Sequence, residues 1–214
     1  MENSVLITLP QSDSVTEYLT AFSKEILDNS EKRNIKSTCL RREKATKENF
    51  EKSIRGSHKL VVFNGHGNTQ CIMGHHNKEI IKKGKNEILL KDKITYARSC
   101  WSASNLGESI VKQGNGTCFV GYNIPFMFLS DITRETTPLK DKFAKVCLET
   151  SNRFPMGIIK GQSSLKAHKN SKKAMLKEIN KAISKGDKDS QAIANTLWNN
   201  YSGQILLGCE TAKL

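Results

Sequence analysis

A histidine and a cysteine each stand at the end of a short apolar run in this chain. His66 follows the segment Leu-Val-Val-Phe-Asn-Gly of residues 60–65, and Cys100 follows Ile-Thr-Tyr-Ala-Arg-Ser of residues 94–99. Runs rich in β-branched and aromatic residues are typical of buried strands. Neighbouring parallel strands bring their carboxyl ends to one edge of a sheet, where ligand crevices form. The sequence therefore predicts that a base and a nucleophile meet at this edge.

The chemistry of this pair depends on how the thiol is activated. A cysteine attacks a carbonyl carbon as the thiolate, and a free thiol with a pKa of about 8.5 is mostly protonated at neutral pH. We expect His66, and a helix beginning near Ser104, to lower the pKa of Cys100. The backbone N–H groups of Gly67 and Cys100 are the predicted oxyanion hole. With His66 protonating the leaving amine, these roles are those of a cysteine peptidase.

The elements that must position this pair alternate along the chain. A capping box of Ser14 and Glu17 predicts the start of the first helix, and Pro138 is expected to open a later one. Alternating strands and helices predict a mostly parallel sheet covered on both faces, a three-layer α/β/α sandwich. Strands are expected over 5–9, 35–40, 59–63, 94–99, 117–122 and 204–207, and the other helices over 47–55, 104–113, 161–184 and 190–201.

We expect residues 1–214 to form a single domain with two distinctive parts. Segment 68–93 reads as a hairpin-like insert beside the active edge, with strands near 70–73 and 79–81 and an edge piece at 87–90. Residues 139–202 form a helical carboxyl-terminal part. The connection 123–138 contains the apolar stretch Ile-Pro-Phe-Met-Phe-Leu, which must pack as a wall or move as a lid.

The cysteine content and the net charge indicate the cellular compartment and the kinds of partner to expect. The six cysteines form no CxxC pair, and Cys118 and Cys147 lie in apolar segments typical of the core, so a reducing cytoplasm is expected. No apolar run is long enough to span a membrane. The formal net charge is +13, with lysines crowded in 78–93 and 166–188. This charge can attract nucleic acid or an acidic protein, but solvated helix faces are the favoured interpretation.

The motif around each reactive residue resembles the caspase-like (clan CD) cysteine peptidases. The similarity covers residues 59–122, and the segment 100–122 is closest to the pattern of CHAT domains and gingipains. This resemblance implies a caspase-like fold and a dyad of His66 and Cys100, with Gly67 in the oxyanion hole and no cofactor or metal. It also implies a protein substrate and activation by a partner protein or by processing.

Arg98 carries a further expectation about specificity. It stands two residues before Cys100, so strict strand alternation turns both side chains towards the substrate. The resemblance places glutamine, aspartate or glutamate at this position, lining the S1 pocket. An arginine there would pair with a P1 carboxylate, which predicts cleavage after Asp or Glu. The alternative is that Arg98 pairs with a neighbouring acid such as Asp131 or Glu135.

Three other functions compete with the peptidase. A zinc site is weakly supported, because its candidate ligands lack CxxC or HxxxH spacing and the adjacent histidines of the 74–77 turn are more often simply exposed. A catalytically silent caspase-like module could bind nucleic acid or protein through the basic surface. A different acyl transferase is disfavoured by the lack of a Gly-x-Cys-x-Gly elbow. The candidate zinc ligands are His58, His66, Cys71, His75, His76 and Cys100.

Overall fold

A six-stranded sheet with the order β2-β1-β3-β6-β7-β8 forms the centre of the computed structural model, which describes residues 4–214. The first five strands are parallel and β8 runs antiparallel to β7. All residues of β1, β6 and β7 are buried, because helices cover both faces of the sheet. The strands are β1 (Ser4–Leu9), β2 (Lys36–Arg41), β3 (His58–Asn64), β6 (Ile94–Arg98), β7 (Cys118–Tyr122) and β8 (Gln204–Gly208).

Two helical layers enclose the sheet. On one face, Phe50 and Leu106 pack with Phe63 and Phe119. This layer contains α3 (Lys47–Ser53), α4 (Asn105–Val111) and the hairpin of β4 (Cys71–Met73) and β5 (Glu79–Lys82). The other layer contains α1 (Ser14–Phe22), α2 (Lys24–Glu31), α5 (Lys142–Ser151) and α6 (Arg153–Ile159), with part of α7 (Ser164–Lys185). The predicted three-layer sandwich and the predicted hairpin are confirmed.

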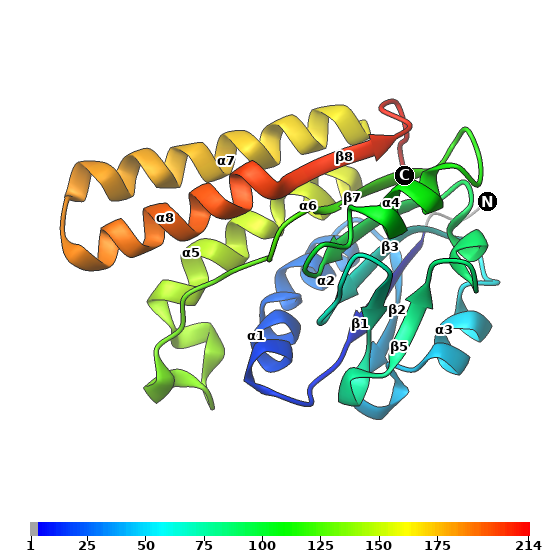
Figure 1. Cartoon of the computed structure of the whole chain (residues 1–214), viewed down its shortest axis with the longest axis horizontal. Helices are drawn as coiled ribbons and strands as arrows, with labels where there is room; N and C mark the ends of the chain where they lie inside the picture. Colours follow the sequence, from blue (N-terminus) through cyan, green and yellow to red (C-terminus); the bar gives the residue numbers. More distant parts are fainter. Residues whose placement is uncertain (1–3) are drawn as a thin grey trace.

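The helices α7 and α8 (Lys188–Gly203) lie side by side and extend beyond the sheet (Figure 1). They share an apolar cluster with α5 in which Cys147, Ile179 and Leu197 are buried. The sheet ends of both helices lie beside β8, which continues directly from α8. Cys118 and Cys147 are both buried, as predicted.

Several boundaries differ from the predicted ones because other side chains cap the helices. Asp13 rather than Ser14 caps α1, forming its capping box with Thr16 instead of Glu17. The helix predicted from Pro138 begins at Lys142, because Asp141 accepts the first free N–H groups of α5. Pro138 belongs instead to a short 3₁₀ turn that precedes α5.

Two further features of the elements differ from the prediction. Segment 87–90 forms a 3₁₀ turn rather than an edge strand. The helix α6 is an additional element that starts after a break at Asn152. At the surface of α8, Trp198 is 56% exposed and stacks on Tyr201.

Candidate active site

The register between β3 and β6 brings the two predicted catalytic residues to the same level of the sheet. Asn64 pairs with Arg98, and these are the last residues of the two strands. His66 and Cys100 each follow two positions later. A Cβ atom built on Gly67 would overlap the Ser99 hydroxyl and lie 3.3 Å from the Cys100 carbonyl oxygen. The loop carrying His66 therefore lies directly against the loop carrying Cys100.

The backbone around His66 needs both of its flanking glycines. Gly65 has a φ of 145°, and a Cβ atom there would collide with the Met73 carbonyl. The Met73 N–H donates to the His66 carbonyl at 2.9 Å, and Gly67 forms a bridge with Ile72. The β4–β5 hairpin thus supports the histidine loop from the side, as the sequence predicts for the insert.

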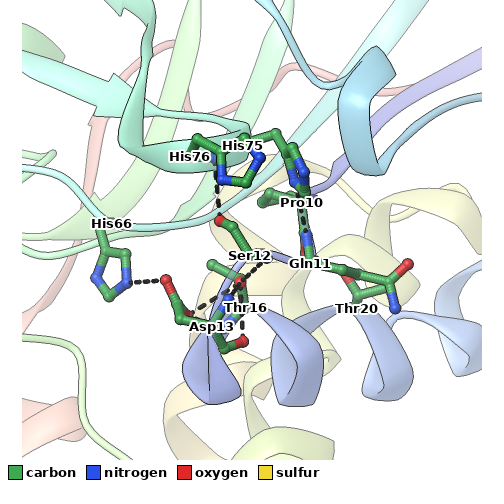
Figure 2. A network of polar contacts seen from close by, with 9 residues as sticks. All are labelled: Pro10, Gln11, Ser12, Asp13, Thr16, Thr20, His66, His75 and His76. Atoms are coloured by element: carbon green, nitrogen blue, oxygen red, sulfur yellow. Dashed lines mark hydrogen bonds and ion pairs between the residues drawn. The ribbon is translucent and has the colours of Figure 1, made fainter.

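Asp13 is a residue of this site that the sequence analysis missed. His66 Nε2 lies 3.1 Å from Asp13 Oδ2, while the other ring nitrogen, Nδ1, points away from the carboxylate (Figure 2). Burial tends to raise the pKa of Asp13, but hydrogen bonds from the Thr16 N–H and hydroxyl and from His66 outweigh it and lower that pKa below its usual value. An ionised Asp13 holds the ring with Nε2–H donating, which leaves Nδ1 free to act as a base.

A polar network fixes the loop that carries Asp13 (Figure 2). The Thr16 hydroxyl accepts the N–H groups of Ser12 at 3.0 Å and of Asp13 at 3.1 Å. The His76 N–H donates to the Ser12 hydroxyl at 3.1 Å. His75, expected to be an exposed turn residue, is buried and faces the Gln11 N–H, whereas His76 is exposed. The turn of the β4–β5 hairpin therefore clamps the start of α1 beside His66.

Cys100 is partly buried and faces a backbone carbonyl. Its Sγ lies 3.9 Å from the Phe126 carbonyl oxygen, and burial raises the pKa of the thiol. The expected lowering of this pKa by His66 and a helix start is therefore absent in this conformation. Ser104 makes no capping hydrogen bond to α4. Trp101, the next residue after the cysteine, has a φ of 52°, a strained conformation for a bulky side chain that turns the chain sharply at Cys100.

The segment facing Cys100 is tied to α8. We call residues 123–129 the strap. Asn200, only 1% exposed, accepts the Met127 N–H at 2.9 Å and donates to the Met127 carbonyl at 2.6 Å. Asn199 donates to the Pro125 carbonyl at 2.8 Å, and the Trp101 N–H donates to the Ile124 carbonyl at 3.2 Å. The apolar stretch predicted to form a wall or lid is thus held over the cysteine by a pair of asparagines.

The predicted oxyanion hole has free donors. Among residues 4–214, neither the Gly67 nor the Cys100 N–H donates to a backbone carbonyl. In the antiparallel bridge between Gly67 and Ile72, the hydrogen bonds are made by the neighbouring residues, so the Gly67 N–H stays available. Two backbone donors from adjacent loops are the usual means of stabilising an oxyanion.

Arg98 does not line a substrate surface, and the prediction that it contacts P1 is wrong. Its side chain is fully buried, and all five of its N–H groups donate to protein oxygens. Neither Asp131 nor Glu135 is among the acceptors. Because β6 ends at Arg98 and the chain turns at Ser99, strand alternation does not extend to Cys100. The acceptors are Asn64 Oδ1, Ser151 Oγ, Asn152 Oδ1, the Leu19 carbonyl and Ser23 Oγ.

Comparison with known proteins supports the architecture. The chain is similar to the crystal structure of gingipain R (RgpB), described as an Arg-specific cysteine proteinase, with a TM-score of 0.63 and 11% identity. The fold is caspase-like. The match covers 100% of this chain and 48% of the gingipain chain, so the present sequence spans about half of that structure. No protein-family model, including one for CHAT domains, and no curated protein sequence matches the chain.

Within residues 4–214, no group of three or more histidine, cysteine, aspartate or glutamate side chains is arranged to hold a metal ion. All six cysteines are free thiols. In the same range, every helix is too short or too polar to cross a bilayer.

Proposed function

We propose that this chain is a cysteine endopeptidase in which Cys100 is the nucleophile, His66 the general base and acid, and Asp13 the residue that orients His66. The proposal rests on one observation: His66 and Cys100 each lie two residues after Asn64 and Arg98, which pair with each other at the ends of β3 and β6. The hydrogen bond between His66 and Asp13 and the free N–H groups of Gly67 and Cys100 support it. The caspase-like fold, shared with a cysteine proteinase, is consistent with it.

Each residue has a defined part in the reaction. His66 Nδ1 takes the proton from Cys100, and Sγ attacks the carbonyl carbon of a peptide bond. The N–H groups of Gly67 and Cys100 stabilise the oxyanion of the tetrahedral intermediate. His66 then gives its proton to the leaving amine, and the C–N bond breaks to leave a thioester. Water, deprotonated by His66, hydrolyses the thioester and restores the thiol, while Asp13 stabilises the imidazolium throughout.

The resting arrangement fits an enzyme that needs activation. The strap covers the thiol with the Phe126 carbonyl, and burial raises the pKa of Cys100, which favours the protonated, unreactive form. Displacement of the strap would admit substrate and let Nδ1 of His66 reach the thiol. We propose that a partner protein or cleavage of the connection 123–138 displaces it.

The decisive experiment uses acyloxymethyl ketone peptides with Asp, Lys, Arg or Leu at P1, with labelling located by intact and peptide mass spectrometry. After an added protease has cleaved the connection 123–138, we expect wild type to be labelled at Cys100, and the Cys100→Ala and His66→Ala variants treated in the same way to lose that labelling. Cys209 provides the matched control, because the Thr211 hydroxyl lowers the pKa of this more accessible thiol. A Cys209→Ser variant should therefore keep peptide-probe labelling but lose much of its reaction with iodoacetamide.

The pattern of labelling separates the alternatives. Labelling at Cys100 that depends on His66 supports the peptidase, and the preferred probe defines P1 without any assumption about Arg98. Labelling that follows general thiol reactivity, with Cys209 ahead of Cys100, contradicts it. If Cys100 stays inert after the connection 123–138 has been cleaved by an added protease, the caspase-like module with a binding role becomes the better account.

A further inference from the structure

A surface cavity of about 510 Å³ lies where the end of the 123–138 connection meets α5, α7 and α8. Four basic side chains line it: Arg134, Lys140, Lys142 and Lys185. They come from four separate elements, namely two 3₁₀ turns, the first turn of α5 and the last turn of α7. Cations converging from several elements on one hollow differ from a row of lysines along a single helix, because they can surround one compact anion.

One wall of this cavity is held in place by the buried carboxylate of Asp141. Its Oδ1 accepts the N–H groups of Phe143 and Ala144, and its Oδ2 accepts the Asp131 N–H at 2.7 Å. The Tyr18 hydroxyl also donates to Oδ2 at 2.7 Å, and burial raises the pKa of that phenol well above its usual value. The turns that carry Arg134, Lys140 and Lys142 are therefore anchored to the helical layer before any ligand arrives.

The opposite wall is ordered by Asp187. This residue caps α8 by accepting the Ser190 N–H at 2.8 Å, and it pairs with Lys185 at 3.0 Å. The Ser190 N–H and the Lys185 ammonium lower the pKa of Asp187 to about 2. Both α5 and α8 begin at this cavity, but the carboxylates of Asp141 and Asp187 already accept the first N–H groups of these two helices, so the positive charge offered to a ligand is that of the four basic side chains.

The rest of the lining limits the chemistry of the ligand. Phe143, Val146 and Ile193 give the cavity an apolar side. Two carboxylates are also present, Asp131 and Asp189. Asp131 is turned onto its own loop, where Oδ1 accepts the Thr133 N–H and hydroxyl at 2.9 and 2.7 Å. Inorganic phosphate would engage the cations but leave the apolar side empty, whereas a ligand with both a polyphosphate and a flat ring would use both sides.

We propose that this cavity binds a nucleoside triphosphate. The phosphates contact Arg134, Lys140 and Lys142 through charge-assisted hydrogen bonds. The base packs against Phe143 and Ile193, and Asp189 accepts hydrogen bonds from the ribose hydroxyls. Binding requires neither His66 nor Cys100, so the proposal is independent of peptidase activity.

Calorimetric titration of the full chain with ATP, GTP, AMP and inorganic tripolyphosphate at physiological salt tests this proposal. We expect the triphosphates to bind at least about tenfold more tightly than AMP, because AMP lacks two of the phosphates. The nucleoside triphosphates should also bind more tightly than tripolyphosphate, which lacks the ring. Equal binding of tripolyphosphate and ATP would overturn the assignment to nucleotides, and no binding at millimolar ATP would overturn the site itself.

Two double variants locate the binding. Lys140→Ser with Lys142→Ser should weaken ATP binding about tenfold or more, since both side chains are exposed cations of the cavity. Lys166→Ser with Lys169→Ser removes the same charge from the exposed face of α7 and should change the Kd by less than about twofold. An equal loss in the two double variants would mean that ATP senses only the net charge of the chain, and the proposal would fail.

Discussion

Two pairs of residues at the carboxyl ends of β3 and β6 have contrasting environments: Asn64 with Arg98, and His66 with Cys100, each of which lies two residues further along its chain segment. Asn64 and Arg98, the last paired residues, are fully buried, and every N–H of the guanidinium has an acceptor. His66 and Cys100 are partly exposed, and their loops leave backbone N–H groups free. The first pair organises the interior, and the second retains the hydrogen-bonding capacity that the proposed catalysis requires.

Arg98 of the buried pair also contacts the two points where one helix ends and the next begins. Arg98 donates to Leu19 and Ser23, where α1 gives way to α2, and to Ser151 and Asn152, where α5 gives way to α6. The carboxyl ends of α1 and α5 direct negative dipole ends towards the guanidinium, which has no carboxylate directly bonded to it among residues 4–214. Burial lowers the pKa of Arg98, and these oxygens compensate for the lost water.

If this contrast holds, removing Arg98 should cost stability, whereas removing His66 should cost little. Arg98→Leu removes five buried hydrogen bonds, and only the Leu19 carbonyl keeps other donors, so we expect the free energy of unfolding to fall by about 3 kcal/mol or more. His66→Leu, at a partly exposed side chain, should change it by less than about 1 kcal/mol. Urea denaturation followed by circular dichroism measures both, and Arg98→Lys provides a variant that keeps the charge if Arg98→Leu does not fold. Similar values for the two leucine variants would show that the contrast is wrong.

Loss of the Asn200 side chain should release the strap and expose His66 and Cys100. Asn200→Ala removes both hydrogen bonds to Met127, and we expect a loss of about 2 kcal/mol in unfolding free energy. The rate of iodoacetamide alkylation at Cys100 should rise several-fold, because the thiol loses its cover. The rate at Cys209, far from the strap in sequence and already accessible, is the internal reference.

Asn199→Ala is the matched control for this variant. It removes the bond to the Pro125 carbonyl and a longer contact of 3.5 Å with Asn200 Oδ1, but it leaves both bonds between Asn200 and Met127, so its effect on Cys100 alkylation should be smaller. If Asn200→Ala destabilises the protein but leaves the alkylation rate of Cys100 unchanged, the strap is a structural wall and does not gate the site.

The strands and the two reactive positions were predictable because they depend on local apolar runs. Residues 60–64 and 94–98 are apolar, β-prone and of strand length, so the sheet edge that receives His66 and Cys100 follows from them. The environment of Arg98 was not predictable in this way. Whether a strand continues for two more residues decides which way a side chain faces, and β6 ends where the prediction extends it.

Asp13 was missed for a different physical reason. The sequence Asp13-Ser14-Val15-Thr16-Glu17 offers two N-caps that differ by one residue in register. Asp and Ser are equally good N-caps, but only Ser14 with Glu17 matches the usual capping-box pattern, so the local sequence favours the wrong register. The tertiary contacts select between them. Thr16 is buried and binds the Ser12 and Asp13 N–H groups, which leaves the second Asp13 oxygen directed at His66.

Asp13 both caps α1 and bonds to His66, so two substitutions can separate these two roles. Asp13→Ala removes the helix cap and the partner of His66 together, and we expect it to lower the free energy of unfolding by about 1 kcal/mol. Asp13→Asn keeps an oxygen that can accept the Thr16 N–H, so its stability at pH 7 should lie between those of wild type and Asp13→Ala. Both variants should slow probe labelling of Cys100 by about 10- to 100-fold, no more than the lower end of the 10²–10⁴-fold contribution typical of general acid–base catalysis, because Asp13 orients the base and does not itself transfer the proton. A normal labelling rate in Asp13→Asn would restrict Asp13 to capping α1.

The pH dependence of stability gives an independent check on the charge of Asp13. The pKa of this carboxyl is lower in the folded state than in the unfolded chain, so ionised Asp13 stabilises the fold above the unfolded value of about 3.9. That contribution is lost as the pH falls through the lowered folded pKa. Wild type should therefore exceed Asp13→Asn in stability at neutral pH, with the difference shrinking below about pH 4. A difference that stayed constant down to pH 2 would mean that the hydrogen-bond geometry of Asp13, and not its negative charge, is what the site requires.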